Sequence, residues 1–210
     1  MTEPLLDYAA LAAAPVATAP YTHIMLRNFI APVTLARIRA DVPDVSRGGS
    51  FPPEALALGP TARAMMAEMQ GERLKTLIAE KLNIDLADAP TMLTMRVHCR
   101  EKDGQIHTDS DAKLVTILLY LNQKEDGFTG REGRLRLLRS ATDLEDYAIE
   151  VPPTDATLLI FPNGPTTWHG HHSFTGKRLS VQLNYMTSDG KARSELRRHK
   201  LSALWKRATA

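Results

Sequence analysis

The chain has 210 residues, of which 43% are hydrophobic and 24% charged, and its formal net charge is +2. This composition is typical of a globular protein and excludes a disordered chain, while a single cysteine, Cys99, excludes an internal disulfide framework. No apolar run approaches the roughly 18 residues of a membrane-spanning helix. The Ala-rich start carries Glu3 and Asp7 where a signal peptide has lysines, so we expect a cytoplasmic protein without membrane partners.

The first ninety residues combine one strand with several helices. Residues 21–30 ("YTHIMLRNFI") have strand-like composition. Residues 31–42 are predicted to be a helix because Pro32 suits a first turn, where its missing N–H costs nothing. Residues 60–70 are also predicted to be helical, and in residues 71–84 apolar side chains recur at the i, i+3, i+4, i+8 spacing of a helix face.

The pattern changes after residue 90, where strand-like runs follow one another between Gly, Pro, Asn and Asp. Six runs are predicted to be strands: 91–99, 113–122, 133–140, 147–153, 156–163 and 178–186. Residues 105–107 and 168–174 could add two more short strands. Short strands with no long helix between them favour an antiparallel sandwich or barrel, with the N-terminal helices on one outer face.

We expect one domain over residues 1–210, divided into three regions. Residues 1–90 form an N-terminal support, residues 91–187 the β-rich core, and residues 188–210 a basic C-terminal helix. From Lys191 to the end there are seven basic residues and one acidic residue. Such a tail can meet nucleic acid or an acidic partner, but it is more often the solvated face of a terminal helix.

Two of the predicted strands have distinct faces, because successive side chains of a strand alternate in direction. In residues 178–186 the polar set shares one face: Arg178, Ser180, Gln182 and Asn184. In residues 113–122 one face carries Thr116, Leu118 and Tyr120, and the other carries Val115, Ile117, Leu119 and Leu121. The polar face must meet either water or a polar cavity, and the strand that is apolar on both faces is predicted to be central.

Candidate metal ligands come from two distant segments. His107 and Asp109 point the same way on an extended segment, so they could hold one face of a metal ion. His169, in "WHGHHSFTGKR", would complete a two-His-one-carboxylate triad, which leaves open positions and suits ferrous iron in oxygenases. Arg178 follows nine residues later, and its guanidinium can grip a carboxylate with two parallel hydrogen bonds. The alternative is a set of polar surface loops, since His-x-Asp is common by chance.

The sequence combines His-x-Asp, a distant His and an Arg nine residues after that His. This motif resembles that of the iron(II)- and 2-oxoglutarate-dependent dioxygenases, and it is closest to their prolyl-hydroxylase-like branch. The resemblance covers residues 91–187 with specific motifs and residues 21–42 more loosely. The stretch "HTDSDAKLVTILLYLN" is similar to that branch's motif strand and following core strand, and "GRLRLL" and "ATLLIFPN" to its next strands. The stretch "HCREKDGQIH" departs from the Gly-rich, Tyr-containing segment of many prolyl hydroxylases, which weakens the case for a peptidyl-proline substrate.

The resemblance implies a mainly β protein, a double-stranded β-helix (jelly roll) flanked by helices on one face. It implies His107, Asp109 and His169 as iron ligands, and Arg178 with the Tyr120 hydroxyl as the site of the 2-oxoglutarate 5-carboxylate. The implied reaction uses O₂ and 2-oxoglutarate, releases succinate and CO₂, and hydroxylates a C–H bond of an amino acid, peptide residue or small metabolite. The implied cofactors are Fe(II) and 2-oxoglutarate, with ascorbate as an optional reductant.

Two other functions stay open. A nucleic-acid demethylase of the same iron chemistry would use the basic tail, but the strand after Arg178 reads "LSVQLNYM" and lacks the second arginine of the nucleic-acid repair branch. A metal-binding jelly roll without oxygenase activity is the other alternative. Within the oxygenases, Asp109 favours hydroxylation, because a halogenating site must free the carboxylate position for halide.

For several neighbouring residues the sequence leaves two interpretations open, a contact in the site or a purely structural role. These residues are Arg96, His98, Trp168, His171, His172, Gln182 and Asn184. Spacing favours His169 as the third ligand, because Arg178 would follow His171 or His172 by only seven or six residues. Lys177 has the opposite strand parity to Arg178, so Arg178 is preferred as the carboxylate-binding residue.

Overall fold

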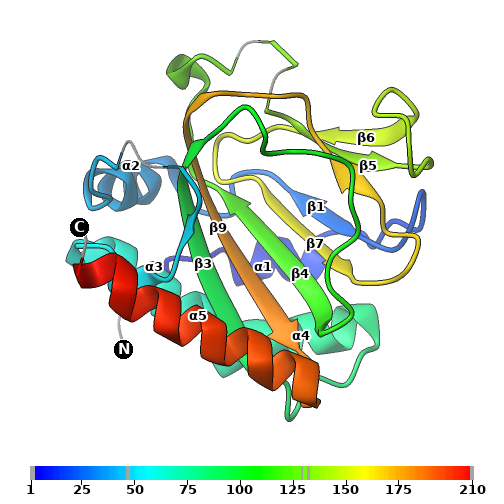
Figure 1. The fold of residues 1–210 in the computed structure, drawn as a ribbon, viewed down its shortest axis with the longest axis horizontal. Coiled ribbons are helices and arrows are strands. Elements are labelled where there is room, and N and C mark those ends of the chain that lie inside the picture. The colour runs from blue at the N-terminus through cyan, green and yellow to red at the C-terminus, as the bar shows by residue number, and fades with distance from the viewer. Residues whose placement is uncertain (1–2, 46–47, 129, 132, 209–210) are drawn as a thin grey trace.

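The computed structural model describes residues 3–45, 48–128, 130–131 and 133–208, and its strands form two antiparallel sheets (Figure 1). The larger sheet has six strands in the order β1-β7-β4-β9-β3-β2, and the smaller has three in the order β6-β5-β8. The bounds are β1 (Ile24–Leu26), β2 (Ser50–Phe51), β3 (Thr91–Cys99), β4 (Lys113–Tyr120), β5 (Leu135–Leu138), β6 (Tyr147–Val151), β7 (Leu158–Pro162), β8 (His169–Gly170) and β9 (Gly176–Met186).

The strands lie where the sequence predicts them. Five of the six predicted runs contain one strand each, the run 178–186 lies within β9, and residues 168–174 supply β8. Residues 105–107 form no named strand; instead His107 makes an isolated antiparallel bridge with His169. The predicted mainly β, antiparallel fold is therefore confirmed.

Alternation along β4 and β9 separates a core from a cavity. These two strands are central neighbours in the larger sheet. One face packs into the main hydrophobic core with Val115, Ile117, Leu119, Leu179, Val181 and Leu183. On the other face, Tyr120 packs with Leu159 and Phe161 of β7 against Leu135 and Leu137 of the smaller sheet. The two sheets therefore face one another across a second, smaller core.

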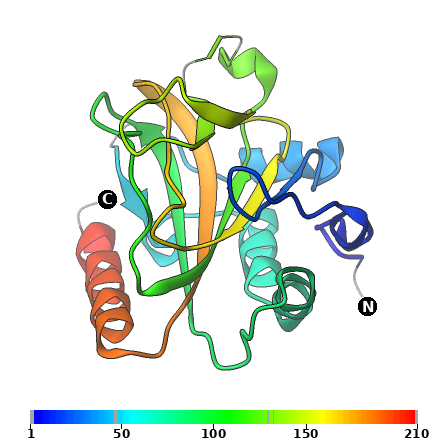
Figure 2. The ribbon, with the colours of Figure 1, turned by 90° about the vertical axis from the view of Figure 1, so that its right-hand side faces the viewer.

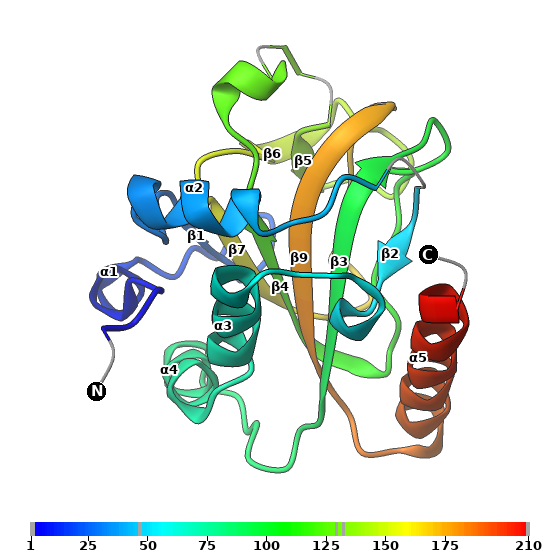
Figure 3. The ribbon, with the colours of Figure 1, turned by 90° about the vertical axis from the view of Figure 1, so that its left-hand side faces the viewer.

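Helices cover the outer face of the larger sheet. Their bounds are α1 (Tyr8–Ala13), α2 (Pro32–Ala40), η1 (Pro53–Ala55), α3 (Pro60–Met69), α4 (Glu72–Leu82), η2 (Lys124–Asp126) and α5 (Gly190–Ala208). Figure 3 shows α2, α3 and α4 on one side of the sheet, and Leu35, Met65 and Ile78 from these helices belong to the main core. Helix α5 lies on the other side of the molecule (Figure 2), where it contacts η1 and β2.

Local sequence signals explain most helix ends. Pro32 and Pro60 stand in the first turns of α2 and α3. Asn83 ends α4 in the left-handed conformation with φ 52°. Helix α1 is not among the predicted elements, although Asp7 gives it an N-cap by accepting a hydrogen bond from Ala10 N at 2.9 Å. Among the described residues, no helix combines the length and apolar character needed to cross a membrane.

Candidate metal centre and cosubstrate pocket

The predicted metal ligands lie together at one end of the space between the sheets. One ligand atom each from His107, Asp109 and His169 lies within 4.8 Å of the others. The two histidine segments are tied by reciprocal backbone hydrogen bonds, in which each N–H donates to the other residue's carbonyl at 3.0 Å. Their ring centroids are 4.4 Å apart. The two distant motifs of the sequence therefore meet in one cluster.

The hydrogen bonds of both imidazoles leave one nitrogen free for a metal. His107 Nδ1 lies 2.8 Å from the carbonyl of Gln105, and His169 Nδ1 lies 2.9 Å from the carbonyl of Thr167. A carbonyl oxygen only accepts, so each Nδ1 carries the proton and each Nε2 keeps its lone pair. Metal-binding histidines are held in this way, with the second ring nitrogen donating to a backbone carbonyl.

The Asp109 carboxylate is held as an anion by two neighbours. Lys113 Nζ donates to Oδ1 at 2.6 Å, and the Thr116 hydroxyl donates to Oδ2 at 2.5 Å. Burial alone would raise the pKa of Asp109, but Lys113 and His169 hold that pKa below its ordinary value. A metal ion that displaces either partner meets a carboxylate that is already ionised. Neither contact with Asp109 was predicted from the sequence, although the predicted strand parity places Thr116 on the cavity face.

His169 is a neutral, buried imidazole. Only 4% of its surface is exposed, and its ring centroid lies 5.2 Å from that of Phe161. Burial lowers the pKa of His169 to about 4 and outweighs the opposing effect of Asp109. The neutral form is the one that binds a metal ion.

A cavity of about 120 Å³ opens beside this cluster. Its walls come from β3, β4, β5, β8 and β9 and from the loop that precedes β4. The lining residues are Arg96, Asp103, Gly104, His107, Asp109, Thr116, Leu118, Tyr120, Leu135, His169, Gly170, His171, Arg178, Ser180 and Gln182. The polar face of β9 thus lines a cavity and does not face bulk water.

Arg178 offers an unused buried donor in this cavity. The residue is 5% exposed, and its Nε donates to the carbonyl of Gly133 at 3.0 Å. Its Cζ lies 5.1 Å from the centre of the Tyr120 ring. Its Nη2 is buried and has no hydrogen-bond partner among the described residues. A buried guanidinium nitrogen without an acceptor is costly, so the cavity fits a ligand that brings a carboxylate to this point. The donors present therefore fit both an iron ion and 2-oxoglutarate.

Three of the residues left open by the sequence join the cavity. Arg96 lines it from β3, Gln182 from β9, and His171 from the segment after β8. His171 is 7% exposed, and burial, followed by Arg178, lowers its pKa to about 4. Its Nδ1 lies 2.7 Å from the carbonyl of His172. Its ring also occupies the space beside Gly104, where a Cβ would come within 2.4 Å of it.

His172 lies outside the cavity lining and belongs to a charge network. Its Nε2 lies 2.7 Å from Glu145 Oε1 and 2.9 Å from Arg136 Nη1. Arg136 is fully buried, binds Glu150 at 3.0 Å, and stacks over Tyr147 with its Cζ 4.4 Å from the ring centre. The network fastens the segment after β8 to the outside of the smaller sheet.

The other open residues take structural positions. Trp168 is half-buried, and its carbonyl accepts hydrogen bonds from the Tyr21 hydroxyl and from Leu138 N. His98 is not part of the cavity lining. Lys177 is exposed, and its only described ion pair is with Asp44 at 4.0 Å.

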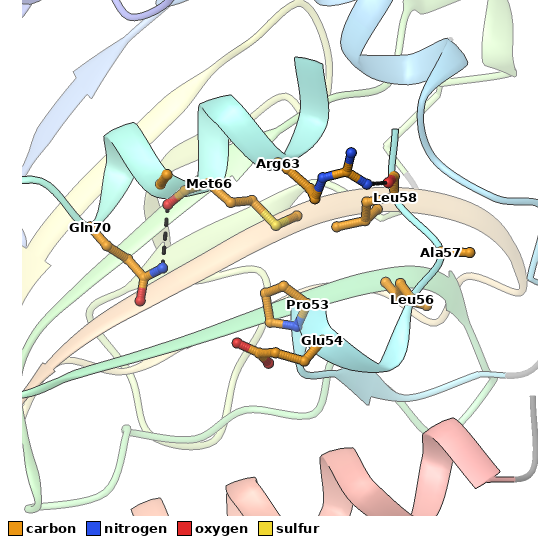
Figure 4. A pocket seen from close by; sticks show the side chains of 9 residues that line it. Pro53, Glu54, Leu56, Ala57, Leu58, Arg63, Met66 and Gln70 are labelled. Carbon is orange, nitrogen blue, oxygen red and sulfur yellow. Dashed lines mark hydrogen bonds between the residues drawn. The ribbon is translucent and has the colours of Figure 1, made fainter. Parts of the chain in front are cut away.

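A larger hollow of about 570 Å³ lies far from these ligands, between η1 and α3 (Figure 4). Two of its three polar side chains are already used, because Arg63 donates to the carbonyl of Leu58 and Gln70 to that of Met66. No histidine lines it, and its only acid is Glu54. The candidate metal ligands therefore line the smaller cavity and not this hollow.

Comparisons with known proteins agree with this assignment. Residues 95–186 match the model of the 2OG-Fe(II) oxygenase superfamily. Among curated proteins, none matches the chain by sequence. Solved structures with a similar fold include a Pseudomonas putida prolyl-4-hydroxylase, with 18% identity, a TM-score of 0.59, and coverage of 89% of this chain and 98% of that one.

Two further structures have the same fold at lower identity. The viral collagen prolyl hydroxylase of Paramecium Bursaria Chlorella virus-1 is 13% identical with a TM-score of 0.55, and 80% of this chain covers 96% of that one. A Phytophthora capsici prolyl 4-hydroxylase is 13% identical with a TM-score of 0.56, and 98% of this chain covers 77% of that one. These similarities confirm the predicted jelly-roll architecture.

The matched region spans the whole metal cluster together with Tyr120 and Arg178. The prediction of an iron- and 2-oxoglutarate-dependent oxidoreductase is confirmed at the level of the family, and so are Fe(II) and 2-oxoglutarate as its cofactors. Ascorbate stays a prediction. Residues 95–186 thus match the 2OG-Fe(II) oxygenase superfamily, and they lie in a fold that is similar to that of the prolyl 4-hydroxylases.

Proposed function

We propose that this protein hydroxylates a C–H bond of an amino acid, a peptide residue or another small metabolite, with 2-oxoglutarate as cosubstrate. The observation that carries the proposal is the pairing of the His-Asp-His cluster with the unpartnered, buried Nη2 of Arg178 in one cavity. A site that only stores a metal has no need of this guanidinium. We also keep a single domain over residues 1–210 and a cytoplasmic location as proposals.

In the proposed site, three side chains hold the iron. His107 and His169 bind it through Nε2, because their Nδ1 protons are committed to backbone carbonyls. Asp109 supplies one carboxylate oxygen while Lys113 or Thr116 steadies the other. With three protein ligands, an iron ion held here would keep positions open for cosubstrate and O₂.

Arg178 and Tyr120 orient the cosubstrate. The free Nη2 of Arg178 receives the 5-carboxylate of 2-oxoglutarate, while its Nε stays bound to Gly133. Burial raises the pKa of Tyr120 against the opposing effect of Arg178, so its phenol keeps its proton and can donate to the same carboxylate. Iron(II) with 2-oxoglutarate, when bound, supplies O₂ activation and the loss of CO₂, and the protein supplies position and exclusion of water.

Apolar walls protect the reacting centre. Phe161 lies beside His169, and Tyr21 packs edge-on against Phe161 with ring centroids 5.9 Å apart. Leu118 and Leu135 also line the cavity. These side chains exclude bulk water from the iron without offering it a competing ligand.

The proposal is tested first by binding and then by turnover. Under anaerobic conditions, Fe(II) with 2-oxoglutarate should give a weak visible charge-transfer absorbance, and aeration should release succinate. His107→Ala should abolish both signals, whereas His172→Gln, which changes a histidine outside the cavity, should retain them. Tight zinc binding with neither absorbance nor succinate would instead indicate a metal-binding module without oxygenase activity.

A further inference from the structure

Two guanidinium groups line the cavity, but the proposed function uses only one. Arg178 lies on β9, and Arg96 lies on β3 directly opposite Ser180, the next cavity-facing residue of β9 after Arg178. His171 lies in the wall of the same cavity. Arg96 is therefore a second cation in the same chamber.

The two arginines differ in depth. Arg178 is 5% exposed and lies over Tyr120, which is 1% exposed, so these residues mark the closed end of the cavity. The Arg96 side chain is 27% exposed, and His107 is also exposed, so these residues mark the open end. A cosubstrate seated on Arg178 leaves Arg96 at the end by which a second substrate enters.

Arg96 is held in place without losing its positive charge. Its Nη1 lies 2.7 Å from Asp103 Oδ2, and its Nη2 donates to the Ser50 hydroxyl at 3.3 Å. Asp103 also accepts from the backbone N–H of Arg100 at 2.9 Å and from its Nη2 at 3.1 Å. One carboxylate thus serves two guanidiniums, and one positive charge remains uncompensated. A charged donor with this geometry suits a carboxylate ligand.

A histidine ring lines the same cavity as this cation. The His171 Nδ1 proton is committed to the carbonyl of His172 at 2.7 Å, which leaves Nε2 as a lone pair on a cavity-lining ring. Asp103 also lines the cavity, and its two oxygens already accept from Arg96 and Arg100. The cavity therefore offers both a cation, Arg96, and a hydrogen-bond acceptor, His171 Nε2.

We propose that the prime substrate is a free amino acid, whose carboxylate binds Arg96 while its N–H group donates to His171 Nε2. The inference rests on the proposed function and narrows its substrate class. A residue inside a peptide has no free carboxylate to offer Arg96. A peptide would leave this guanidinium bound only to Asp103 and Ser50.

The first test compares matched pairs of substrates. Succinate release by the iron-loaded protein is measured with each common free L-amino acid and with its carboxamide, which keeps the N–H group and loses the negative charge. At least one acid should raise succinate release tenfold or more above the substrate-free rate, while its carboxamide should not. Equal stimulation by acid and carboxamide, or by none of the acids, overturns the inference.

The second test assigns the role to Arg96. Arg96→Met should raise KM for the active amino acid by roughly 10- to 100-fold, since a hydrogen bond to a charged group contributes about 1.5–3 kcal/mol, and should leave KM for 2-oxoglutarate unchanged. Arg96→Lys should restore part of the affinity. Arg100→Met is the matched control: Arg100 shares Asp103 with Arg96 but does not line the cavity, so KM should change less than about threefold. Equal effects of Arg96→Met and Arg100→Met would contradict a substrate contact.

Failure of this inference can be told apart from failure of the proposed function. Substrate-free succinate release and the anaerobic absorbance report only on iron and 2-oxoglutarate. If both are present and no amino acid stimulates turnover, the oxygenase proposal stands and the amino acid proposal is wrong. If both are missing, both proposals are wrong. Co(II) binding by Arg96→Met shows whether that variant retains the folded metal site.

Discussion

At the scale of single residues, the metal centre depends on side chains that never touch the metal. Thr116 and Lys113 engage the two oxygens of Asp109, and two backbone carbonyls fix the proton positions of the histidines. Such partners set the direction and charge of a ligand, and removing one typically costs roughly 10- to 100-fold in metal affinity or activity.

Thr116→Val tests this dependence with little change of shape. The variant deletes the hydroxyl that donates to Asp109 Oδ2 at 2.5 Å and leaves that oxygen without its donor. We expect the affinity for Co(II), measured by calorimetry without cosubstrate, to fall by roughly 10-fold. Thr94→Val is the control, because Thr94 lies on β3 and is not in the cavity lining. Unchanged affinity in Thr116→Val would show that Lys113 alone orients the carboxylate.

Sequence reasoning named the candidate ligands, which the structure brings together, but not the partners that position them. His107, Asp109, His169 and Arg178 follow from residue type and spacing. The contact between Lys113 and Asp109 depends on how the loop before β4 turns back, and the burial of His171 depends on the space left by Gly104. Contacts of this kind arise from tertiary packing, which strand periodicity and residue type do not encode.

At the scale of secondary structure, side-chain periodicity predicted the long strands correctly, whereas the shortest elements were missed. The alternation in residues 113–122 and 178–186 correctly separated the core face from the cavity face. Helix α1 and strand β2 were missed because six-residue and two-residue elements are too short to show a period. Their positions are set by contacts with the rest of the fold, such as the pairing of Ser50 with Arg96.

Helix α3 is capped from outside its own sequence, which yields a prediction. Asp41, at the end of α2, accepts hydrogen bonds from Thr61 N at 2.5 Å and Ala62 N at 3.1 Å in the first turn of α3. Gly59 permits this approach, since a Cβ there would lie 2.3 Å from Asp41. Asp41→Ala should lower Tm by a few degrees in thermal unfolding. Asp44→Ala, which changes a nearby exposed acid, should not.

The same cap gives a pH dependence. Burial would raise the pKa of Asp41, but the N–H groups of Ala62 and Thr61, followed by Arg63, hold it below its ordinary value of 3.8. Because the folded pKa is depressed, the stabilisation is complete above pH 3.8 and is lost as pH falls through the lower, folded value. Asp41→Asn should therefore unfold with a shallower dependence on pH below 3.8 than the parent protein. Equal slopes for parent and variant would contradict the cap.

At the scale of the whole molecule, the metal site joins segments from both sheets. His107 precedes β4 of the larger sheet, and His169 begins β8 of the smaller one. A ligand that binds only the folded state raises the free energy of unfolding by about 2.7 kcal/mol at a hundred times its Kd. Co(II) at that concentration should raise Tm by roughly 5–10 °C. EDTA should reverse the shift, and His169→Ala should show none.

The reciprocal hydrogen bonds between the main chains of His107 and His169 have one further consequence. They belong to the peptide framework and not to the imidazoles, so they persist when the ion departs. The His107 and His169 segments therefore keep their spacing without the ion. A returning ion finds two of its three protein ligands already in position. Reloading should then proceed at a speed governed by arrival of the metal and shedding of its water, and not by any slow rearrangement of the polypeptide.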